Sequence, residues 1–360
     1  MKRQPTARTR ALAVVLACLL TGCAANAPAP PPIQAPVVPE QAPPAYDGLT
    51  IYSALPDDEI PVYLNAFRRD TGIEVTYERL SAGEMIARVQ REQDAPRVSV
   101  LLGGPAESYA QADAEGLLEP YQSPALSYVP ERYLDKNRVW NPIYIGVICF
   151  ACNEDWFRAH GEALPDSWDA LLAPALRGQI AMASPETSGT SYTVLAALTR
   201  QRGERDALRY LRALSDSIPA YTRSGIAPAE QVQGGERAVA VVFSHDGRRV
   251  ALDGYPIALR YPEDGVPYEI GACALVRGGP AKERENAMRL IDWMTSERGQ
   301  ECYLEAKSSR LPANANARAA DGLPEPDALP LIECDPAWAG KNRTGLTQAF
   351  RQQTDARKLP

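Results

Sequence analysis

Short apolar runs alternate with amphipathic segments along most of this 360-residue sequence. The first runs, which we predict to be strands, are Leu49–Ser53, Ile73–Leu80 and Arg97–Leu102. Residues 57–69 between them have helical spacing, and a second helix is predicted to open with Ser81 as its N-cap. Strands that alternate with helices indicate parallel βαβ units. The sequence therefore predicts an α/β fold built on doubly wound sheets.

The second half of the chain repeats this alternation after a fourth apolar strand at residues 144–152. The segments predicted there are helices at 166–173, 191–200, 204–215, 226–237 and 281–295, and strands at 179–184 and 238–244. A chain of this length can form two domains, each with its own core.

Polar and glycine-rich residues follow the predicted strands. They are Ser53, Ser81, Gly103-Gly104, Thr187 to Thr190, and His245-Asp246. In open α/β sheets, ligands bind beyond the carboxyl ends of the strands. Two such sheets that face each other would place these loops on the two sides of one cleft.

The stretch 179–200, QIAMASPETSGTSYTVLAALTR, predicts a strand, a polar loop and a helix. Thr187, Ser188, Gly189 and Thr190 lie just before the helical spacing begins. Free N–H groups and the positive end of the helix dipole suit a phosphate, a carboxylate or another anion there. The same residues would also form an ordinary helix N-cap, so both interpretations stay open at this point.

The N-terminus predicts a lipid-anchored envelope protein. Four cations precede the apolar run 11–20, which is too short to span a bilayer, and Leu20-Thr21-Gly22-Cys23 resembles a bacterial lipobox. We expect residues 1–22 to be a lipoprotein signal peptide, with a lipid on Cys23; an ordinary cleaved signal with a chance cysteine is the alternative. Residues 23–47, rich in Ala and Pro, are predicted to be an extended tether that faces the periplasm or the cell exterior.

Charge and cysteine content limit the partners. The formal net charge is −7 and becomes −11 once the four cations of the signal segment are removed, which argues against nucleic acid. Cys149 and Cys152 have a spacing used by redox and zinc sites. They lie in an apolar strand, where they would point to opposite faces, so we predict buried thiols. Cys302 and Cys334 flank polar sequence and are predicted to form a disulfide, which leaves an unpaired cysteine.

Several stretches together resemble the extracellular solute-binding proteins of ABC importers, in the class of the ferric-ion-binding proteins. They are LTIYSA, RLSAGEMIARVQRE, VLLGGPAESYAQADAEGLLEPY, SWDALLAPALRGQIAMASPETSGTSYT, QGGERAVAVVFSHD, AMRLIDWMTSERGQECYLE and RLPANANA. The resemblance implies the two-lobe type II periplasmic-binding-protein fold, a monomer with no cofactor, and delivery of a solute to permease subunits. The lobes implied are residues 48–146 with 271–314, and 147–270 with 315–360.

Within this class, the residues after the strand at 238–244 indicate the ligand. The iron binders carry adjacent tyrosines there, which this sequence lacks, and Fe³⁺ prefers hard anionic oxygen ligands. The hexose-phosphate binders carry His-Asp there and a glutamate further on, as His245, Asp246 and Glu269 do here. The resemblance thus implies a sugar phosphate, held by Ser188–Thr190 at its phosphate. A 2-aminoethylphosphonate whose ammonium group binds to the two carboxylates, or a ferric ion, is the alternative.

The other candidate ligand-binding residues are Ser53, Ser81 and Ser224, each of which would also suit a strand end, a helix cap or a loop. His245-Asp246 would equally suit a turn, and Glu269 a solvated strand position. Catalysis is not expected. Ser188, His245 and Asp246 are triad residue types, but the sequence has no G-x-S-x-G elbow, so an envelope hydrolase is a remote alternative. No H-E-x-x-H is present, and no metal site is predicted.

Overall fold

The structure of this protein is a computed structural model that describes residues 48–360, within the unit Tyr46–Pro360. The predicted signal peptide, the lipidated Cys23 and the tether lie outside the described residues.

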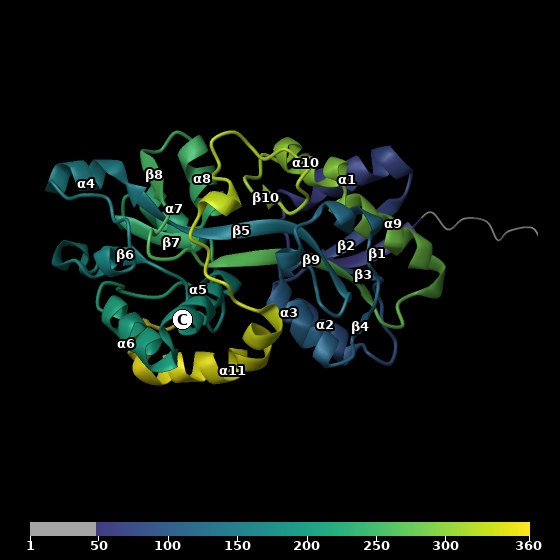
Figure 1. The fold of residues 1–360 in the computed structure, drawn as a ribbon, viewed down its shortest axis with the longest axis horizontal. Helices are drawn as coiled ribbons and strands as arrows, with labels where there is room; N and C mark the ends of the chain where they lie inside the picture. The colour runs from purple at the N-terminus through teal and green to yellow at the C-terminus, as the bar shows by residue number, and fades with distance from the viewer. Residues whose placement is uncertain (1–47) are drawn as a thin grey trace, which may run out of the picture. The chain divides into compact units, whose positions relative to one another are not determined.

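The strands form one continuous ten-stranded mixed sheet (Figure 1). Their bounds are β1 Gly48–Ser53, β2 Glu74–Arg79, β3 Val100–Pro105, β4 Leu118–Glu119, β5 Trp140–Asn153, β6 Ile180–Ala181, β7 Val239–Phe243, β8 Ile257–Arg260, β9 Tyr268–Val276 and β10 Leu311–Pro312. The order is β2-β1-β3-β9-β5-β7-β6, with β4 beside β9 and with β8 and β10 beside β5.

Strand β5 joins the two halves of this sheet. Its residues Trp140–Val147 pair antiparallel with β9, whereas Ile148–Cys152 pair antiparallel with β7. The side chains of β5 are buried from Trp140 to Cys152, because both faces of the strand are covered. The apolar run at 144–152 was therefore correctly predicted as a strand, and it is longer than the sequence pattern indicated. Its central position explains why it lacks a polar face.

Helices cover the sheet, and many of the polar loops lead from a strand into one of these helices. Their bounds are α1 Ile60–Thr71, α2 Ala82–Arg91, α3 Ala106–Ala114, α4 Glu154–His160, α5 Gly189–Arg202, α6 Glu204–Ser215, α7 Ala227–Gln233, α8 Ser244–Leu252, α9 Arg284–Thr295, α10 Glu297–Glu305 and α11 Pro336–Gln353. The 3₁₀ segments are η1 Pro124–Tyr128, η2 Glu131–Tyr133, η3 Asp169–Leu172, η4 Pro174–Leu176, η5 Ala281–Glu283, η6 Pro326–Ala328 and η7 Ala356–Lys358.

Three local predictions were wrong. The helix predicted at 166–173 is only the 3₁₀ turn η3, because Ala173 precedes a proline and is held in an extended conformation. The strand predicted at 179–184 is reduced to Ile180–Ala181 at the sheet edge, with one further bridge from Ala183. His245 and Asp246, predicted to lie in a loop, form the first turn of α8.

The cysteines confirm one prediction and contradict another. Cys149 and Cys152 are fully buried and belong to hydrophobic clusters on opposite faces of β5, as a strand requires. Cys302 and Cys334 are free thiols rather than a disulfide. Cys302 packs in the cluster around α1 and α9, whereas Cys334 packs against the cluster around α5 and α6, so the two side chains belong to separate cores.

Helix α11 connects segments that are distant in the sequence. It packs against α5 and α6 along one part of its length and against α3 at its N-terminal part (Figure 1). Gly340 makes the second contact possible, since a Cβ atom there would lie 2.6 Å from the Glu107 carbonyl oxygen. The start of α3 is therefore held close to α5.

Candidate functional site

The N-terminus of α5 forms the first end of the candidate site. Ser188 occupies the N-cap position, yet its side chain makes no capping hydrogen bond. Its Oγ is buried and has no partner among residues 48–360, and the same is true of the Ser191 hydroxyl in the first turn. The first N–H groups of a helix need partners, and an anion supplies them while it interacts favourably with the helix dipole. We call Ser188, Gly189 and Thr190 the anion cradle.

The segment that ends at Gly225 lies directly over the anion cradle. A Cβ atom at Gly225 would lie 2.2 Å from Thr190 Oγ1 and 2.9 Å from Ser188 Oγ. Only glycine therefore lets this backbone approach the two hydroxyls. The close approach leaves Ser188 and Thr190 largely buried, at 4% and 8% exposure.

Thr187 and Ser224, also predicted to bind ligand, point elsewhere. Thr187 is exposed, and its hydroxyl donates to the Arg223 carbonyl at 2.9 Å. Ser224 is exposed, and its Oγ accepts a hydrogen bond from the Ile226 N–H at 3.4 Å. The Thr187 hydroxyl thus joins the two loops beside the cradle, whereas the Ser224 side chain bonds within its own loop.

The second end of the site brings together residues from α8 and β9. The imidazole of His245 stacks on Phe243, with ring centroids 5.2 Å apart, and its Nδ1 is buried without a partner in the described part of the chain. A Cβ atom at Gly146 would lie 3.1 Å from Glu269 Oε1 and 3.3 Å from His245 Cε1. The missing side chain on β5 thus lets His245 and Glu269 meet, and Asp246 Oδ2 lies 4.0 Å from His245 Nε2. We call His245, Asp246 and Glu269 the acidic end.

Burial sets the protonation of the acidic end. It raises the pKa of Asp246 to about 6. It also raises the pKa of Glu269 to about 8, to which the nearby charge of Glu107 contributes. Burial lowers the pKa of His245 well below its ordinary value, and the positive charge of Arg310 adds to this. At neutral pH the imidazole is neutral and can both donate and accept hydrogen bonds, and Glu269 carries a proton in most molecules.

Arg310 is a residue of this end that the sequence did not reveal. It is 5% exposed, it forms an ion pair with Glu59, and it donates to Ser308 Oγ at 2.8 Å. Its guanidinium carbon lies 4.9 Å from the centre of the Tyr144 ring. Arg310 precedes β10, which pairs with β5 at Tyr144 and Ile145, and this pairing places it in the site. In the sequence, Arg310 belongs to the stretch RLPANANA, which indicated the family but not a role for this arginine in the site.

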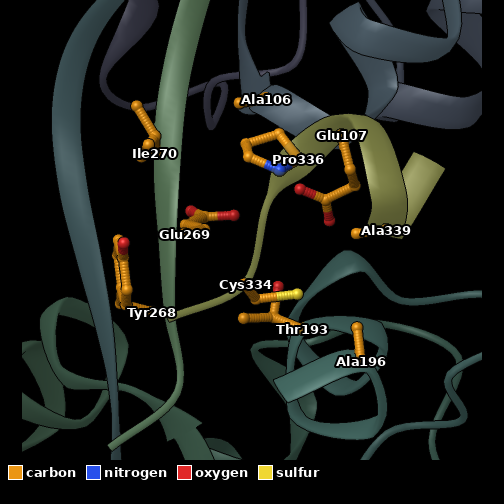
Figure 2. Close-up of a pocket in the computed structure, with 10 residues that line it drawn as sticks. All are labelled: Ala106, Glu107, Thr193, Ala196, Tyr268, Glu269, Ile270, Cys334, Pro336 and Ala339. Carbon is orange, nitrogen blue, oxygen red and sulfur yellow. The ribbon is translucent and has the colours of Figure 1, made fainter. Parts of the chain in front are cut away.

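Glu107, on the first turn of α3, was missed as well. It lines a cavity of about 20 Å³ together with Thr193 of α5, Glu269 of β9 and the segment that leads into α11. Figure 2 shows the carboxylates of Glu107 and Glu269 pointing into this space. The one local signal for it in the sequence is an acidic residue that follows a Gly-Gly-Pro strand end.

Ser53 and Ser81, the remaining predicted residues, lie at the end of β1 and just after β2. Ser53 is fully buried, and its Oγ accepts a hydrogen bond from the Leu55 N–H at 3.3 Å. Ser81 forms a capping box with Glu84: its Oγ accepts from the Glu84 N–H at 3.3 Å, and its own N–H donates to Glu84 Oε2 at 2.9 Å. Both hydroxyls therefore stabilise their own segments.

A larger cavity of about 790 Å³ lies on the α8 side of the acidic end. Asp58 and Glu59, before α1, line it opposite Arg248 and Arg249 of α8. Arg249 Nη1 lies 3.3 Å from Asp58 Oδ2, so an exposed ion pair joins the two walls. Within residues 48–360, no group of three or more His, Cys, Asp or Glu side chains is placed to hold a metal ion. No helix in the same range has the length and apolar character needed to cross a membrane.

The model of the bacterial extracellular solute-binding protein family matches residues 102–337, which is more than half of the chain. The chain belongs to the bacterial extracellular solute-binding proteins. The matched range includes the anion cradle and the acidic end. As a member of this family, the chain is the periplasmic solute-binding component of an ABC transporter.

Sequence relatives of this solute-binding protein differ in their stated ligands. An uncharacterized protein of Haemophilus influenzae is 30% identical over 86% of this chain and 91% of its own. A Fe(3+)-binding periplasmic protein of Serratia marcescens is 26% identical over a match that covers 72% of this chain and 77% of that protein. A putative 2-aminoethylphosphonate-binding periplasmic protein of Salmonella paratyphi A is 25% identical over a match that covers 66% of this chain and 69% of that protein.

Among solved structures, the periplasmic binding protein AfuA of Actinobacillus pleuropneumoniae, with exogenous fructose-6-phosphate bound, has a TM-score of 0.81 to this chain. The two are 28% identical, and the match covers 86% of this chain and 99% of AfuA. The predicted family and the two-lobe type II fold are therefore confirmed.

Proposed function

We propose that this protein captures a small phosphorylated solute, a sugar phosphate, in a cleft between its lobes and delivers it to permease subunits. The observation that carries the proposal is the buried start of α5, where the hydroxyls of Ser188 and Ser191 lack partners within the described residues. A phosphate dianion would satisfy these donors and the first N–H groups of the helix. The likeness to AfuA, which holds fructose-6-phosphate, supports the same ligand class.

The acidic end supplies the partners that a polyol requires. The Asp246 carboxylate accepts hydrogen bonds from hydroxyl groups, and the protonated Glu269 and the neutral imidazole of His245 can each donate and accept. In this proposal Asp246 and Glu269 bind sugar hydroxyls, whereas Ser53 and Ser81 flank the cleft from the other lobe. No catalytic role is assigned to these residues, and the protein is proposed to release its solute unchanged.

A 2-aminoethylphosphonate is the second candidate, favoured by the naming of the Salmonella relative and by the carboxylates of the acidic end. A ferric ion is the third and is favoured only by the naming of other relatives, since the chain lacks adjacent tyrosines.

The lobes are proposed as residues 48–146 with 271–314, and 147–270 with 315–360. Support comes from β5, which changes its pairing partner between Val147 and Ile148. Ligand should close the lobes by a hinge near the crossing strands. A smaller radius of gyration with saturating ligand, measured by solution scattering, is the expected result, and an unchanged radius would contradict it.

Anchoring through Cys23 is proposed from the lipobox, with the protein acting as a monomer in the envelope and without nucleic acid. Cys23→Ser should move the protein from the membrane fraction to the soluble fraction, because acyl chains would be its anchor. Retention of this variant in the membrane fraction would contradict the proposal.

Mass spectrometry of the small molecule that co-purifies with the protein tests the function directly. Calorimetry with glucose 6-phosphate, fructose 6-phosphate, 2-aminoethylphosphonate, inorganic phosphate and ferric citrate then ranks the candidates. Tightest binding of a sugar phosphate supports the proposal. Binding of the ferric salt alone overturns it.

A further inference from the structure

The cavity behind Glu269 has the size of one water-like group. Its volume is about 20 Å³, and a single water requires roughly 10–15 Å³ by the same kind of measure. Its walls come from α3, α5, β9 and the segment that leads into α11, so it lies where distant parts of the chain meet. In Figure 2 the carboxylates of Glu107 and Glu269 point into it from different elements, with Thr193 below them.

Three oxygen-bearing side chains face this space. Glu107, Thr193 and Glu269 are 7%, 6% and 6% exposed. Glu107 Oε1 and Thr193 Oγ1 are buried without a hydrogen-bond partner anywhere in residues 48–360. Unpartnered buried acceptors are costly, and these lie around an opening that one small donor group would fill.

The neighbouring cations are engaged elsewhere. Arg310 forms its ion pair with Glu59, and Arg249 forms one with Asp58. Burial raises the pKa of Glu107, and the charge of Arg343 of α11 offsets this only in part. The Arg343 guanidinium lies over the Tyr192 ring at 4.3 Å, and it forms no ion pair with Glu107 within the described chain. Neither carboxyl group of the cavity is therefore paired with a cation in residues 48–360, and burial raises the pKa of both, which a bound cation would lower again.

We propose that this cavity receives a primary ammonium group of the transported solute, held by Glu107, Glu269 and Thr193. An ammonium group has three N–H donors and one positive charge, which matches three acceptors in a water-sized space. A bound water would bring only two donors and no charge. This proposal rests on the proposed function and narrows its ligand to phosphorylated or phosphonylated primary amines.

The position of Thr193 fixes the geometry of such a solute. Thr190 of the anion cradle and Thr193 lie three residues apart on α5, which is about 4.5 Å along the helix axis. A phosphate or phosphonate at the cradle and an ammonium group at Thr193 are therefore separated by a few bonds. Aminoalkylphosphonates and amino sugar phosphates share this chemistry.

Matched ligand pairs test the inference in calorimetry with the intact protein. The pairs are glucosamine 6-phosphate with glucose 6-phosphate, and 2-aminoethylphosphonate with ethylphosphonate. At least one amine should bind ten- to a hundredfold more tightly than its neutral counterpart. Because the buried Glu269 carries a proton near neutral pH, binding of the amine should also release a proton to the buffer. That release is measured as a dependence of the heat on the buffer's ionisation enthalpy.

Glu107→Gln keeps the shape of the side chain and removes its charge. It should lower the affinity for the preferred amine by about tenfold and leave the neutral counterpart within about threefold. Glu115→Gln, at the exposed C-terminal end of the same helix, is the matched control and should change neither. If Glu107→Gln does not fold, as judged by thermal unfolding, Thr193→Val provides the same comparison.

The outcomes separate this inference from the function on which it rests. If glucose 6-phosphate binds and neither amine binds more tightly than its partner, the ammonium site is overturned and the sugar-phosphate function stands. Equal weakening of both members of a pair by Glu107→Gln likewise overturns the site. If no phosphorylated or phosphonylated compound binds, the proposed function itself is overturned.

Discussion

The anion cradle and the acidic end are built in opposite ways. The cradle is made of consecutive residues, Ser188 to Thr190, and uses backbone N–H groups and neutral hydroxyls. The acidic end gathers titratable side chains from α8, β9 and the segment before β10, and it requires Gly146 to let His245 and Glu269 approach each other. The polar start of α5 thus needs only contiguous residues, whereas a buried group of titratable side chains needs the whole fold to hold it.

The largest expected effect would come from removing the cation of the acidic end. Arg310→Met leaves the part-buried Glu59 without its cation and should lower the free energy of unfolding by about 3 kcal/mol. Chemical denaturation measures this loss. Arg158→Met breaks an exposed ion pair with Asp155 and should cost less than about 1 kcal/mol. Equal losses of unfolding free energy in the two variants would contradict the claim that the buried ion pair contributes more to stability than the exposed one.

A smaller effect is expected on affinity when one carboxylate of the acidic end is lost. Asp246→Ala leaves sugar hydroxyls unpaired in a closed cleft and should weaken sugar-phosphate binding about ten- to a hundredfold, or about 1.5–3 kcal/mol. Inorganic phosphate, held only by the cradle, should bind with nearly unchanged affinity if it binds at all. Calorimetry with both ligands tests this, and unchanged sugar-phosphate affinity would show that Asp246 lies outside the site.

The pH dependence of stability distinguishes the two ends without a ligand. Folding raises the pKa of Glu269 from its ordinary 4.5 to about 8 and that of Asp246 from 3.8 to about 6. The folded state therefore binds more protons than the unfolded state between these values, and stability should fall as pH rises from about 4 to about 8. Each carboxyl contributes a slope of at most about 1.4 kcal/mol per pH unit.

Glu269→Gln should flatten this slope between pH 6 and pH 8, where Asp246 no longer titrates. Denaturation at a series of pH values measures the slope, and the exposed Glu263→Gln is the control that should retain it. A steep fall in stability between pH 6 and pH 8 that persists in Glu269→Gln would assign the titration to another group.

The smallest effect is expected at the cradle, because its hydroxyls are neutral and the backbone N–H groups remain. Ser188→Ala combined with Thr190→Ala should weaken sugar phosphate and inorganic phosphate alike, by about tenfold in total. Calorimetry measures both affinities, and an equal loss for the two ligands indicates that the anion cradle binds the phosphate group. A loss of affinity for the sugar phosphate alone would contradict binding of the phosphate group at the start of α5.

Some elements followed from local sequence alone. The spacing at 204–215 predicted α6 with the bounds that the structure shows, and Ser81 with Glu84 carries the capping box that starts α2. The apolar run at 144–152 predicted the central strand. In each case the determining interactions lie within one helix turn or one strand, so the periodicity of the side chains was sufficient.

Other predictions failed where distant segments decide. The predicted disulfide ignored the fact that Cys302 and Cys334 belong to separate cores. The strand at 179–184 shortened because its pairing depends on β7 and not on its own apolar residues. Ligand binding by Thr187 and Ser224 stays a prediction: the Thr187 hydroxyl donates to the Arg223 carbonyl of the neighbouring loop, and Ser224 Oγ accepts from the Ile226 N–H within its own loop.

By itself, the sequence determined the alternation of strands and helices, the family and the polar start of α5, because each is encoded in contiguous residues. Only the tertiary structure decided the partners of Glu269. Antiparallel pairing of β5 with β9 and β10 brings Glu269 and Arg310 to the same region, and the packing of α11 on α3 holds Glu107 there. Such residues are separated by up to about two hundred positions, and no local pattern encodes a contact that depends on sheet order and register.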